Sequence, residues 1–279
     1  MKIRLLIGSL FLISFLNLNA QEKFSVNANL KTEPTDKIDF NESSIGVLFT
    51  AAINSKNKIK NTIEYSNLIV NYDAGSFEAF ENLDQFNQLK NKFEISNEFS
   101  NTKLNLGLTP TANFQKNLDF SDVTLLGNFE ISQQLNSKTF INLGVSRTTV
   151  FGYPQFMPTL SFQYKVSDKS ALLIGFPDSK ISYSNNIRNA FSLTNSFNGN
   201  FYHLDQSLTG TNNGTKVSTS QMTTALEYER NVDKNWFINL KAGYDFDKKY
   251  NILNNDNHKV YDFNTGNGYI LGIGIKYKQ

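Results

Sequence analysis

The sequence of 279 residues contains no cysteine. This absence excludes a disulfide scaffold, a metal site built on thiolates, a cysteine nucleophile and a lipid anchor on an N-terminal cysteine. Proline is scarce, with five residues, whereas asparagine is frequent, with 38. Such a composition favours many polar turns over long helices.

An excess of charge of one sign is also missing, because 27 basic side chains stand against 25 acidic ones. A chain without a basic footprint is not expected to bind nucleic acid. Lys2 and Arg4 account for the whole excess, since residues 1–20 contain no acidic side chain. The remainder, 21–279, is therefore formally neutral.

The N-terminus has the pattern of a secretory signal peptide. Lys2 and Arg4 precede an apolar stretch over 5–16, and Ala20 offers a small residue for cleavage before Gln21. A membrane anchor is the alternative, but about a dozen apolar residues is shorter than the roughly 20 that a spanning helix needs. We therefore predict two regions, a signal peptide over 1–20 and an exported domain over 21–279.

No later stretch has 18 uninterrupted apolar residues; apolar and polar residues instead alternate with a period of two. Phe24, Val26, Ala28 and Leu30, for example, alternate with polar neighbours. A strand with this pattern has one apolar and one polar face. Several runs approach the roughly 9 to 11 residues of a membrane-barrel strand, whereas soluble strands average about 5 to 6. The runs lie at 24–31, 123–132, 141–146, 160–165, 236–247 and 268–277.

Short and long connections alternate along the chain, as in outer-membrane barrels. This order predicts an all-β fold, a transmembrane antiparallel up-and-down β-barrel of about 14 strands. Twelve strands remain possible if 62–72 or 180–184 does not pair. All five prolines are expected in or beside the longer connections, because proline cannot donate to a strand ladder. We expect the longer connections at 32–41, 73–89, 111–120, 151–158, 205–216 and 248–266.

If the apolar faces meet lipid, charged side chains on the polar faces point into the lumen. Charges of both signs can line a water-filled path or can pair into a network that fills the barrel, and the sequence leaves both open. A further segment, 80–89, carries Phe80, Leu83, Phe86 and Leu89 at three-residue spacing; we expect an ordinary ordered surface loop there, with a short helical loop at the mouth as the alternative. The predicted lumen-facing charges are Glu94, Glu98, Lys103, Glu130, Lys165, Glu227, Glu229, Lys241 and Lys276.

Residues for catalysis are few. His203 and His258 are the only histidines, and His203 would share a strand face with Asp205. A barrel hydrolase using His203 is thus one alternative, but Ser207 is the only hydroxyl nearby in that strand. We expect a protein that is not an enzyme, with no catalytic residue, no metal site and no cofactor.

The chain resembles the uncharacterised outer-membrane β-barrel proteins of Bacteroidota. The resemblance rests on Ala20 and Gln21, the turns that combine Asn and Lys, the Gly-Phe-Pro-Asp run at 175–178 and the closing Gly-Ile-Lys-Tyr-Lys at 274–278. It implies a fold and a location but no activity.

We therefore expect an exported protein of the outer membrane, most simply a structural barrel or a passive path for small solutes. Its expected partners are outer-membrane lipid and, during insertion, the barrel-assembly machinery. A soluble periplasmic β-sandwich that binds a ligand is the remaining alternative.

Overall fold

The computed structural model describes residues 23–73, 77, 80, 82–208 and 213–279, so the predicted signal peptide lies outside the described residues. Strands dominate this part of the chain, and none of its helices is long and apolar enough to cross a membrane. The strands are β1 (Lys23–Pro34), β2 (Ile38–Ala52), β3 (Asn57–Tyr72), β4 (Gln85–Phe99), β5 (Thr102–Phe114), β6 (Val123–Asn136), β7 (Thr139–Thr148), β8 (Gln155–Lys165), β9 (Ser170–Phe176), β10 (Asp178–Asn186), β11 (Asn189–Leu208), β12 (Gly214–Asp233), β13 (Trp236–Leu253), β14 (Lys259–Asp262) and β15 (Gly268–Lys278).

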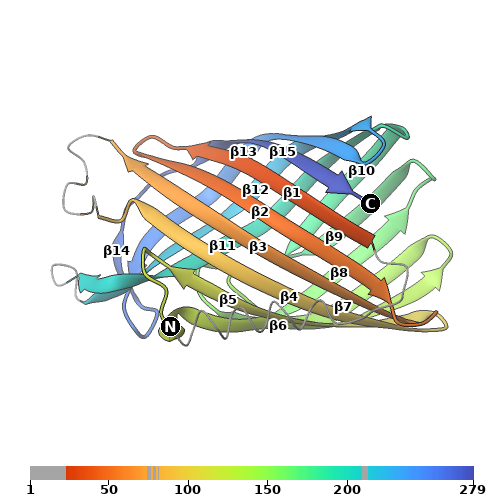
Figure 1. The fold of residues 1–279 in the computed structure, drawn as a ribbon, viewed down its shortest axis with the longest axis horizontal. Coiled ribbons are helices and arrows are strands. Elements are labelled where there is room, and N and C mark those ends of the chain that lie inside the picture. The colour runs from red at the N-terminus through yellow and green to blue at the C-terminus, as the bar shows by residue number, and fades with distance from the viewer. Residues whose placement is uncertain (1–22, 74–76, 78–79, 81, 209–212) are drawn as a thin grey trace.

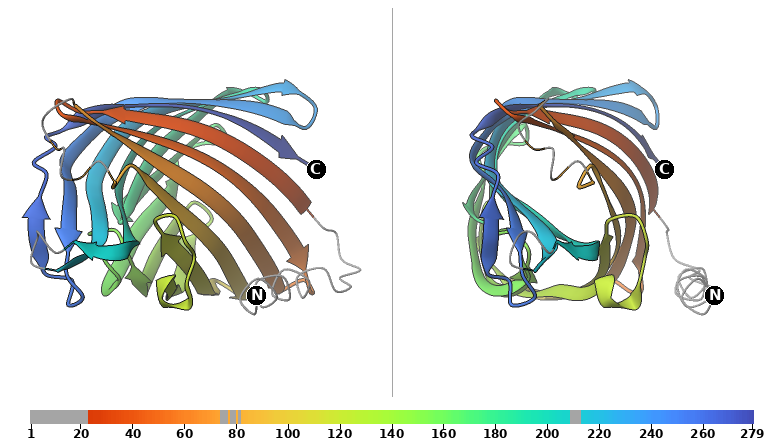
Figure 2. Two further views of the ribbon diagram at one scale, coloured as in Figure 1. Left: turned by 60° about the vertical axis from the view of Figure 1, so that its left-hand side comes forward. Right: turned by 90° about the vertical axis from the view of Figure 1, so that its left-hand side faces the viewer.

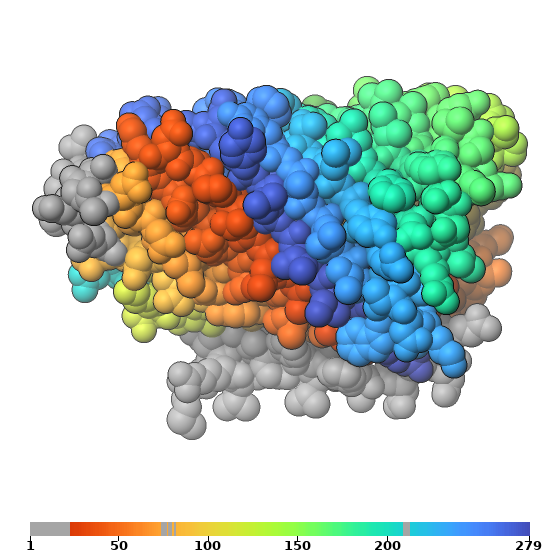
Figure 3. Space-filling view, turned by 90° about the horizontal axis from the view of Figure 1, so that it is seen from above, coloured from red at the N-terminus to blue at the C-terminus, as the bar shows by residue number. Residues whose placement is uncertain are grey.

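These strands form a closed antiparallel barrel (Figure 1). Each strand from β1 to β13 pairs with the next along the chain, and β15 pairs with both β13 and β1, which joins the two ends of the sheet. Figure 3 shows this closure on the outer face, where β15 in dark blue lies between β1 in red and β13 in blue. Without the four-residue β14, fourteen strands make the wall. The predicted count of about 14 is confirmed, since 62–72 and 180–184 both pair.

The two faces of the sheet differ as the alternation predicts. Leu30 on β1, Ile45 on β2 and Ile273 on β15 lie on neighbouring strands and are 61%, 52% and 51% exposed on the outer face. The polar residues between them point into the lumen. An apolar exterior around a polar interior is the arrangement of a membrane-spanning barrel.

The two ends of the barrel have different connections. Six connections of two to four residues and the C-terminal strand end lie at one end, which we call the turn end. The remaining connections, most of them longer, lie at the opposite end, which we call the loop end; it is on the left in Figure 1.

The barrel narrows toward the loop end. There His203 on β11 pairs in parallel with Phe114 on β5, so the wall bypasses the five strands from β6 to β10. Nine of the fourteen strands remain in this smaller ring. Figure 2 shows the ends of β11 and β12, in teal, turned inward from the wall. An enclosure of about eight strands is one that side chains fill, whereas wider barrels leave open space.

The loop that joins β7 and β8 covers the outside of this inward turn. The hydroxyl of Thr149 donates to the carbonyl oxygen of Gly199 at 2.7 Å. A Cβ atom built on Gly199 would lie 2.3 Å from the oxygen of Thr149, so only glycine allows so close an approach. Phe201 and Ser218 are buried beneath the loop.

Two expectations about the connections are wrong. Pro110 lies inside β5 and Pro158 inside β8, not in loops. Both are tolerated because one of the two neighbouring strands does not pair with the barrel strand at the proline, where the missing N–H donor is therefore not needed. In β5, Pro110 has no partner on β4. In β8, pairing with β9 begins only at Leu160, beyond Pro158. The expected loops at 32–41, 111–120, 205–216 and 248–266 are also too long, because strands extend into each of them above the apolar band.

The segment 80–89 is helical only at its start, where Phe80 lies in a short 3-10 turn and its carbonyl oxygen accepts a hydrogen bond from the backbone N–H of Leu83 at 2.8 Å. From Gln85 onward it is strand β4, which includes Phe86 and Leu89. Phe80 and Leu83 precede this strand and are buried at the loop end. The three-residue spacing therefore reflects this turn and burial at the mouth, and not a longer helix.

Candidate functional site

Apolar side chains fill the lumen at the loop end. Tyr202 on β11 and Tyr250 on β13 both point inward, and each is 2% exposed or less. Tyr250 meets Phe40 of β2 with ring centroids 5.2 Å apart, and its hydroxyl lies 2.8 Å from that of Tyr72 on β3. We call this cluster the plug; its residues are Ile38, Phe40, Leu68, Val70, Phe80, Leu83, Phe86, Tyr202, Val217, Tyr250, Ile252 and Phe263.

Contacts within the plug cross the lumen. The strands β3 and β13 are separated in the wall by β15, β1 and β2, yet their tyrosine hydroxyls touch. Phe86 of β4 packs on Tyr202 of β11 at 5.0 Å between ring centroids. Below this pair, the side-chain amide of Gln88 donates to Asn200 of β11 at 3.1 Å. Side chains that meet across the ring leave no open path between them.

A buried ion network lies next to the plug. Lys248 on β13 binds Glu33 on β1 and Asp245 on its own strand, and the Nζ–Oδ2 distance to Asp245 is 3.1 Å. The side chains of all three are 5% exposed or less. Gln221 donates to both carboxylates at 3.1 to 3.3 Å, and Thr223 donates to Asp245 at 2.6 Å. This network connects β1, β12 and β13 on the inner face of the barrel wall.

A β-bulge in β13 makes the network possible. Between Ser220 and Met222 of β12 the register with β13 shifts, and Asp247 takes a left-handed φ of 49°. An extra residue at a bulge reverses the alternation of faces. Asp245 and Lys248, three residues apart, therefore both point inward, whereas unbroken alternation would place them on opposite faces.

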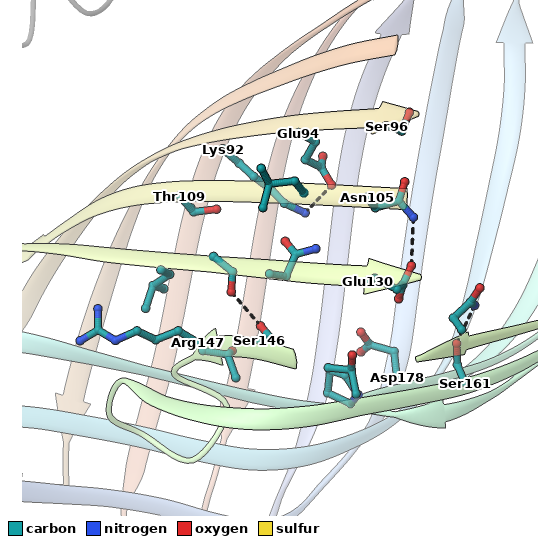
Figure 4. Close-up of a pocket in the computed structure, with 18 of the residues that line it drawn as sticks. Lys92, Glu94, Ser96, Asn105, Thr109, Glu130, Ser146, Arg147, Ser161 and Asp178 are labelled. Carbon is teal, nitrogen blue, oxygen red and sulfur yellow. Dashed lines mark hydrogen bonds and ion pairs between the residues drawn. The ribbon is translucent and has the colours of Figure 1, made fainter. Parts of the chain in front are cut away.

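A polar cavity of about 740 Å³ occupies the lumen toward the turn end (Figure 4). Strands from β2 to β10 contribute to it. Its charged lining residues are Lys58, Lys60, Lys92, Lys103, Arg147, Glu94, Glu130 and Asp178. A volume of this size lies within the roughly 300 to 1,000 Å³ of small-molecule sites.

Glu94 holds two of the cavity lysines. Its carboxylate lies 3.1 Å from the Nζ atom of Lys60 and 2.9 Å from that of Lys92. Glu130 accepts a hydrogen bond from the amide of Asn105 at 3.2 Å. Figure 4 shows the Lys92–Glu94 and Asn105–Glu130 contacts along the cavity wall.

The nine predicted lumen-facing charges fall into three groups. Glu94, Lys103 and Glu130 line the cavity. Glu98 stands opposite Lys103 in the strand register, close to the turn. Lys165 forms an ion pair of 2.7 Å with Asp168 in the turn that follows β8.

The remaining four form ion pairs along the opposite wall. Glu227 lies 3.5 Å from Lys241 and 3.6 Å from Lys180. Glu229 lies 2.6 Å from Lys276 and 3.3 Å from Lys278. These pairs connect strands no more than two apart, so they strengthen the wall without crossing the lumen. A functional role for the nine residues stays a prediction.

His203 does not contact Asp205, the neighbour with which it would act in the hydrolase alternative. Its Nδ1 atom lies 4.0 Å from Asp122 in the 3-10 turn η2 (Phe120–Asp122), while Asp205 accepts hydrogen bonds from Asn117. Burial raises the pKa of Asp122. His203 thus helps to close the narrow ring, and among the described residues no three His, Asp or Glu side chains group closely enough to hold a metal ion.

Some important residues were missed in the sequence. Lys58 and Lys60 alternate with Ile59 and Asn61, so the period-two pattern could have identified them. Glu33 and Lys248 fell in segments expected to be loops. No local pattern marks them, because the bulge and the contact across the lumen exist only in the folded barrel.

The strand order, the apolar exterior and the enclosed lumen define a β-barrel of the outer-membrane type. The chain belongs to the family described as domain of unknown function (DUF6268), which matches residues 82–278. No curated protein matches the chain.

Several solved structures are similar in fold. The P. putida toluene transporter TodX shares 8% identity over 95% of this chain and 91% of its own, with a TM-score of 0.47. The NanC porin shares 7% identity over 91% of this chain and 100% of its own, with a TM-score of 0.46. Outer membrane phospholipase A from Escherichia coli shares 8% identity over 90% of this chain and 92% of its own, with a TM-score of 0.36. At these identities the likeness does not transfer an activity to this chain.

Proposed function

We propose that this protein is a structural outer-membrane barrel whose lumen is closed at the loop end and forms a polar chamber at the turn end. The observation that carries this proposal is the contact between β3 and β13 across the lumen, through Tyr72 and Tyr250. Because the plug fills the lumen on both sides of this contact, we expect the barrel not to conduct ions in its resting state.

The location and orientation follow from the same architecture. The apolar outer face provides the contact with outer-membrane lipid, and residues 1–20 supply export. Short turns of bacterial barrels face the periplasm. In this orientation the cavity opens toward the periplasm and the plug lies at the cell exterior. Insertion would depend on the barrel-assembly machinery, to which the final strand β15 ending at Lys278 would be presented.

Recording of currents in planar bilayers tests the closure. The folded wild-type protein should give no conductance steps. The double variant Tyr202→Ala and Tyr250→Ala should give steps, because it removes two of the largest buried side chains of the plug. Tyr269→Ala is the matched control, since Tyr269 is 67% exposed on the outer face, and it should stay silent.

A heat-dependent shift in gel migration establishes that each variant is folded before recording. Regular steps from the wild-type protein would overturn the closed state and favour the alternative, a passive path for small solutes. A folded double variant that stays silent would show that the plug is not what closes the lumen.

A further inference from the structure

Two lysines in the turn-end cavity lack ion-pair partners. Within the described part of the chain, neither Lys58 on β3 nor Lys103 on β5 forms an ion pair, although both line the cavity. They lie on either side of β4, whose Glu94 already binds Lys60 and Lys92. Unlike the paired lysines, Lys58 and Lys103 are available to a ligand.

The charges that line the cavity are unequal in number. Four lysines stand against three acidic side chains, since Arg147 shares the outer face of β7 with Leu143 and Val145, so the lining has one positive charge in excess. Low-dielectric walls focus such a field and raise the local concentration of ions of opposite sign. The excess favours an anionic ligand.

The charges of the connections at the two ends of the barrel also favour an anion in the cavity. The six connections at the turn end contain five basic side chains and one acidic one, Asp168. The described connections at the loop end, β14 included, contain seven acidic side chains and three basic ones. An anion is therefore attracted to the entrance of the cavity and repelled from the opposite end.

Hydrogen-bond acceptors in the same wall point to hydroxyl groups on the ligand. Among the residues that the structure describes, Glu130 is bound only by the neutral amide of Asn105, and Asp178 forms no ion pair. Carboxylates and amides accept hydrogen bonds from hydroxyls, which an inorganic anion without protons cannot offer. Asn142 and Ser161, which bond to each other at 2.8 Å, extend this polar wall.

We propose that the turn-end cavity binds a small hydroxylated anion, of the class of sugar acids and sugar phosphates, through Lys58 and Lys103. The inference deepens the proposed function and rests on it, because closure above the cavity makes it a binding site and not a section of a continuous channel.

Isothermal titration calorimetry of the full barrel, folded in a neutral detergent at low salt, tests the proposal. The probes are glucose 6-phosphate, gluconate, glucose and inorganic phosphate. We expect both hydroxylated anions to bind more tightly than glucose, which lacks the charge, and than phosphate, which lacks the additional hydroxyls. Binding of gluconate alone or of glucose 6-phosphate alone identifies which anionic group the cavity prefers, and either result supports the proposal.

The variants Lys58→Gln and Lys103→Gln should each weaken binding by about tenfold, the effect of one lost charge-assisted hydrogen bond. Lys37→Gln is the matched control, because it removes the same charge from an exposed connection at the loop end, outside the cavity lining, and should leave binding unchanged.

Absence of binding to the wild-type protein, equal binding of glucose and the two anions, or unchanged binding in both cavity variants would overturn the proposal. Calorimetry is independent of the conductance test. A barrel that conducts but still loses affinity with Lys58→Gln would refute the closure while leaving the anion site in place.

Discussion

The two ends of this barrel differ in how far side chains fill the lumen. At the loop end aromatic side chains and a buried ion network meet across the lumen. At the turn end the polar side chains stay on their own wall and surround a cavity. Both ends are built from the same alternating strands, so the difference does not arise from strand pattern alone.

Circumference separates the two ends. All fourteen strands surround the turn end, whereas β11 meets β5 at the loop end and leaves nine. Inward side chains reach each other in the smaller ring but not in the larger one. Variants at matched positions in the two regions can therefore test how far the stability of the barrel depends on contact across the lumen.

The largest effect is expected from Tyr250→Ala in the plug. Removing a fully buried aromatic side chain costs about 3 to 5 kcal/mol of stability, because it leaves a cavity. Unfolding of the detergent-folded barrel in guanidinium chloride measures this loss. Tyr250→Phe, which removes only the hydroxyl and its contacts with Tyr72 and the carbonyl oxygen of Leu83, should cost about 1 kcal/mol. Equal losses in the two variants would contradict packing as the main contribution.

A loss of similar or slightly smaller size is expected from Lys248→Met. The change leaves Asp245 buried without its cation and Glu33 with Lys31 as its remaining ion-pair partner, and breaking a buried ion pair in this way costs about 3 to 5 kcal/mol. The neighbouring Lys249→Met is the matched control, because Lys249 pairs with the exposed Asp247 and should lose less than about 1 kcal/mol. Comparable denaturation midpoints for the two variants would show that the network is not important for stability.

An intermediate effect is expected where the loop between β7 and β8 covers the narrow ring. Gly199→Ala introduces a Cβ atom against the backbone of Thr149 and should cost about 1 to 3 kcal/mol. Gly272→Ala on β15 is the comparison, because the nearest atom to a Cβ there is the Cβ of Lys241 at 3.4 Å. It should be tolerated, and a loss as large as that of Gly199→Ala in the same unfolding assay would refute the difference.

The smallest effect is expected from Glu229→Gln on the wall near the turn end. Its ion pairs with Lys276 and Lys278 are partly exposed to water, and such pairs contribute roughly 0.2 to 1 kcal/mol. The difference between Glu229→Gln and wild type should shrink further in high salt, because the pair is screened. A loss of several kcal/mol that salt does not change would indicate that this wall is as tightly coupled as the plug.

The sequence predicted the barrel because its signal is local. Alternation over 24–31 and 268–277 places Leu30 and Ile273 on one face whichever strands lie beside them. The order of short and long connections then predicted the number of strands. The prolines were misjudged because tolerance of Pro110 depends on which neighbouring ladder is missing, and a single strand does not contain that information.

The candidate site was predicted only in part. Glu94, Lys103 and Glu130 were placed in the lumen by alternation alone, and they line the cavity. Lys58 was not selected, although the same pattern applies to it. That Glu94 binds Lys60 and Lys92, and that Lys58 has no described ion-pair partner, follows from the register between β3 and β4.

The sequence by itself determined the class of fold, the number of strands and the face on which the charges of the unbroken strands lie, because a period of two residues is a property of one strand. Only the tertiary structure decided where the lumen is filled. The pairing of His203 with Phe114 sets the circumference, and the bulge at Asp247 turns Lys248 toward Glu33. Both depend on residues far apart in the chain, which come together only when the barrel closes.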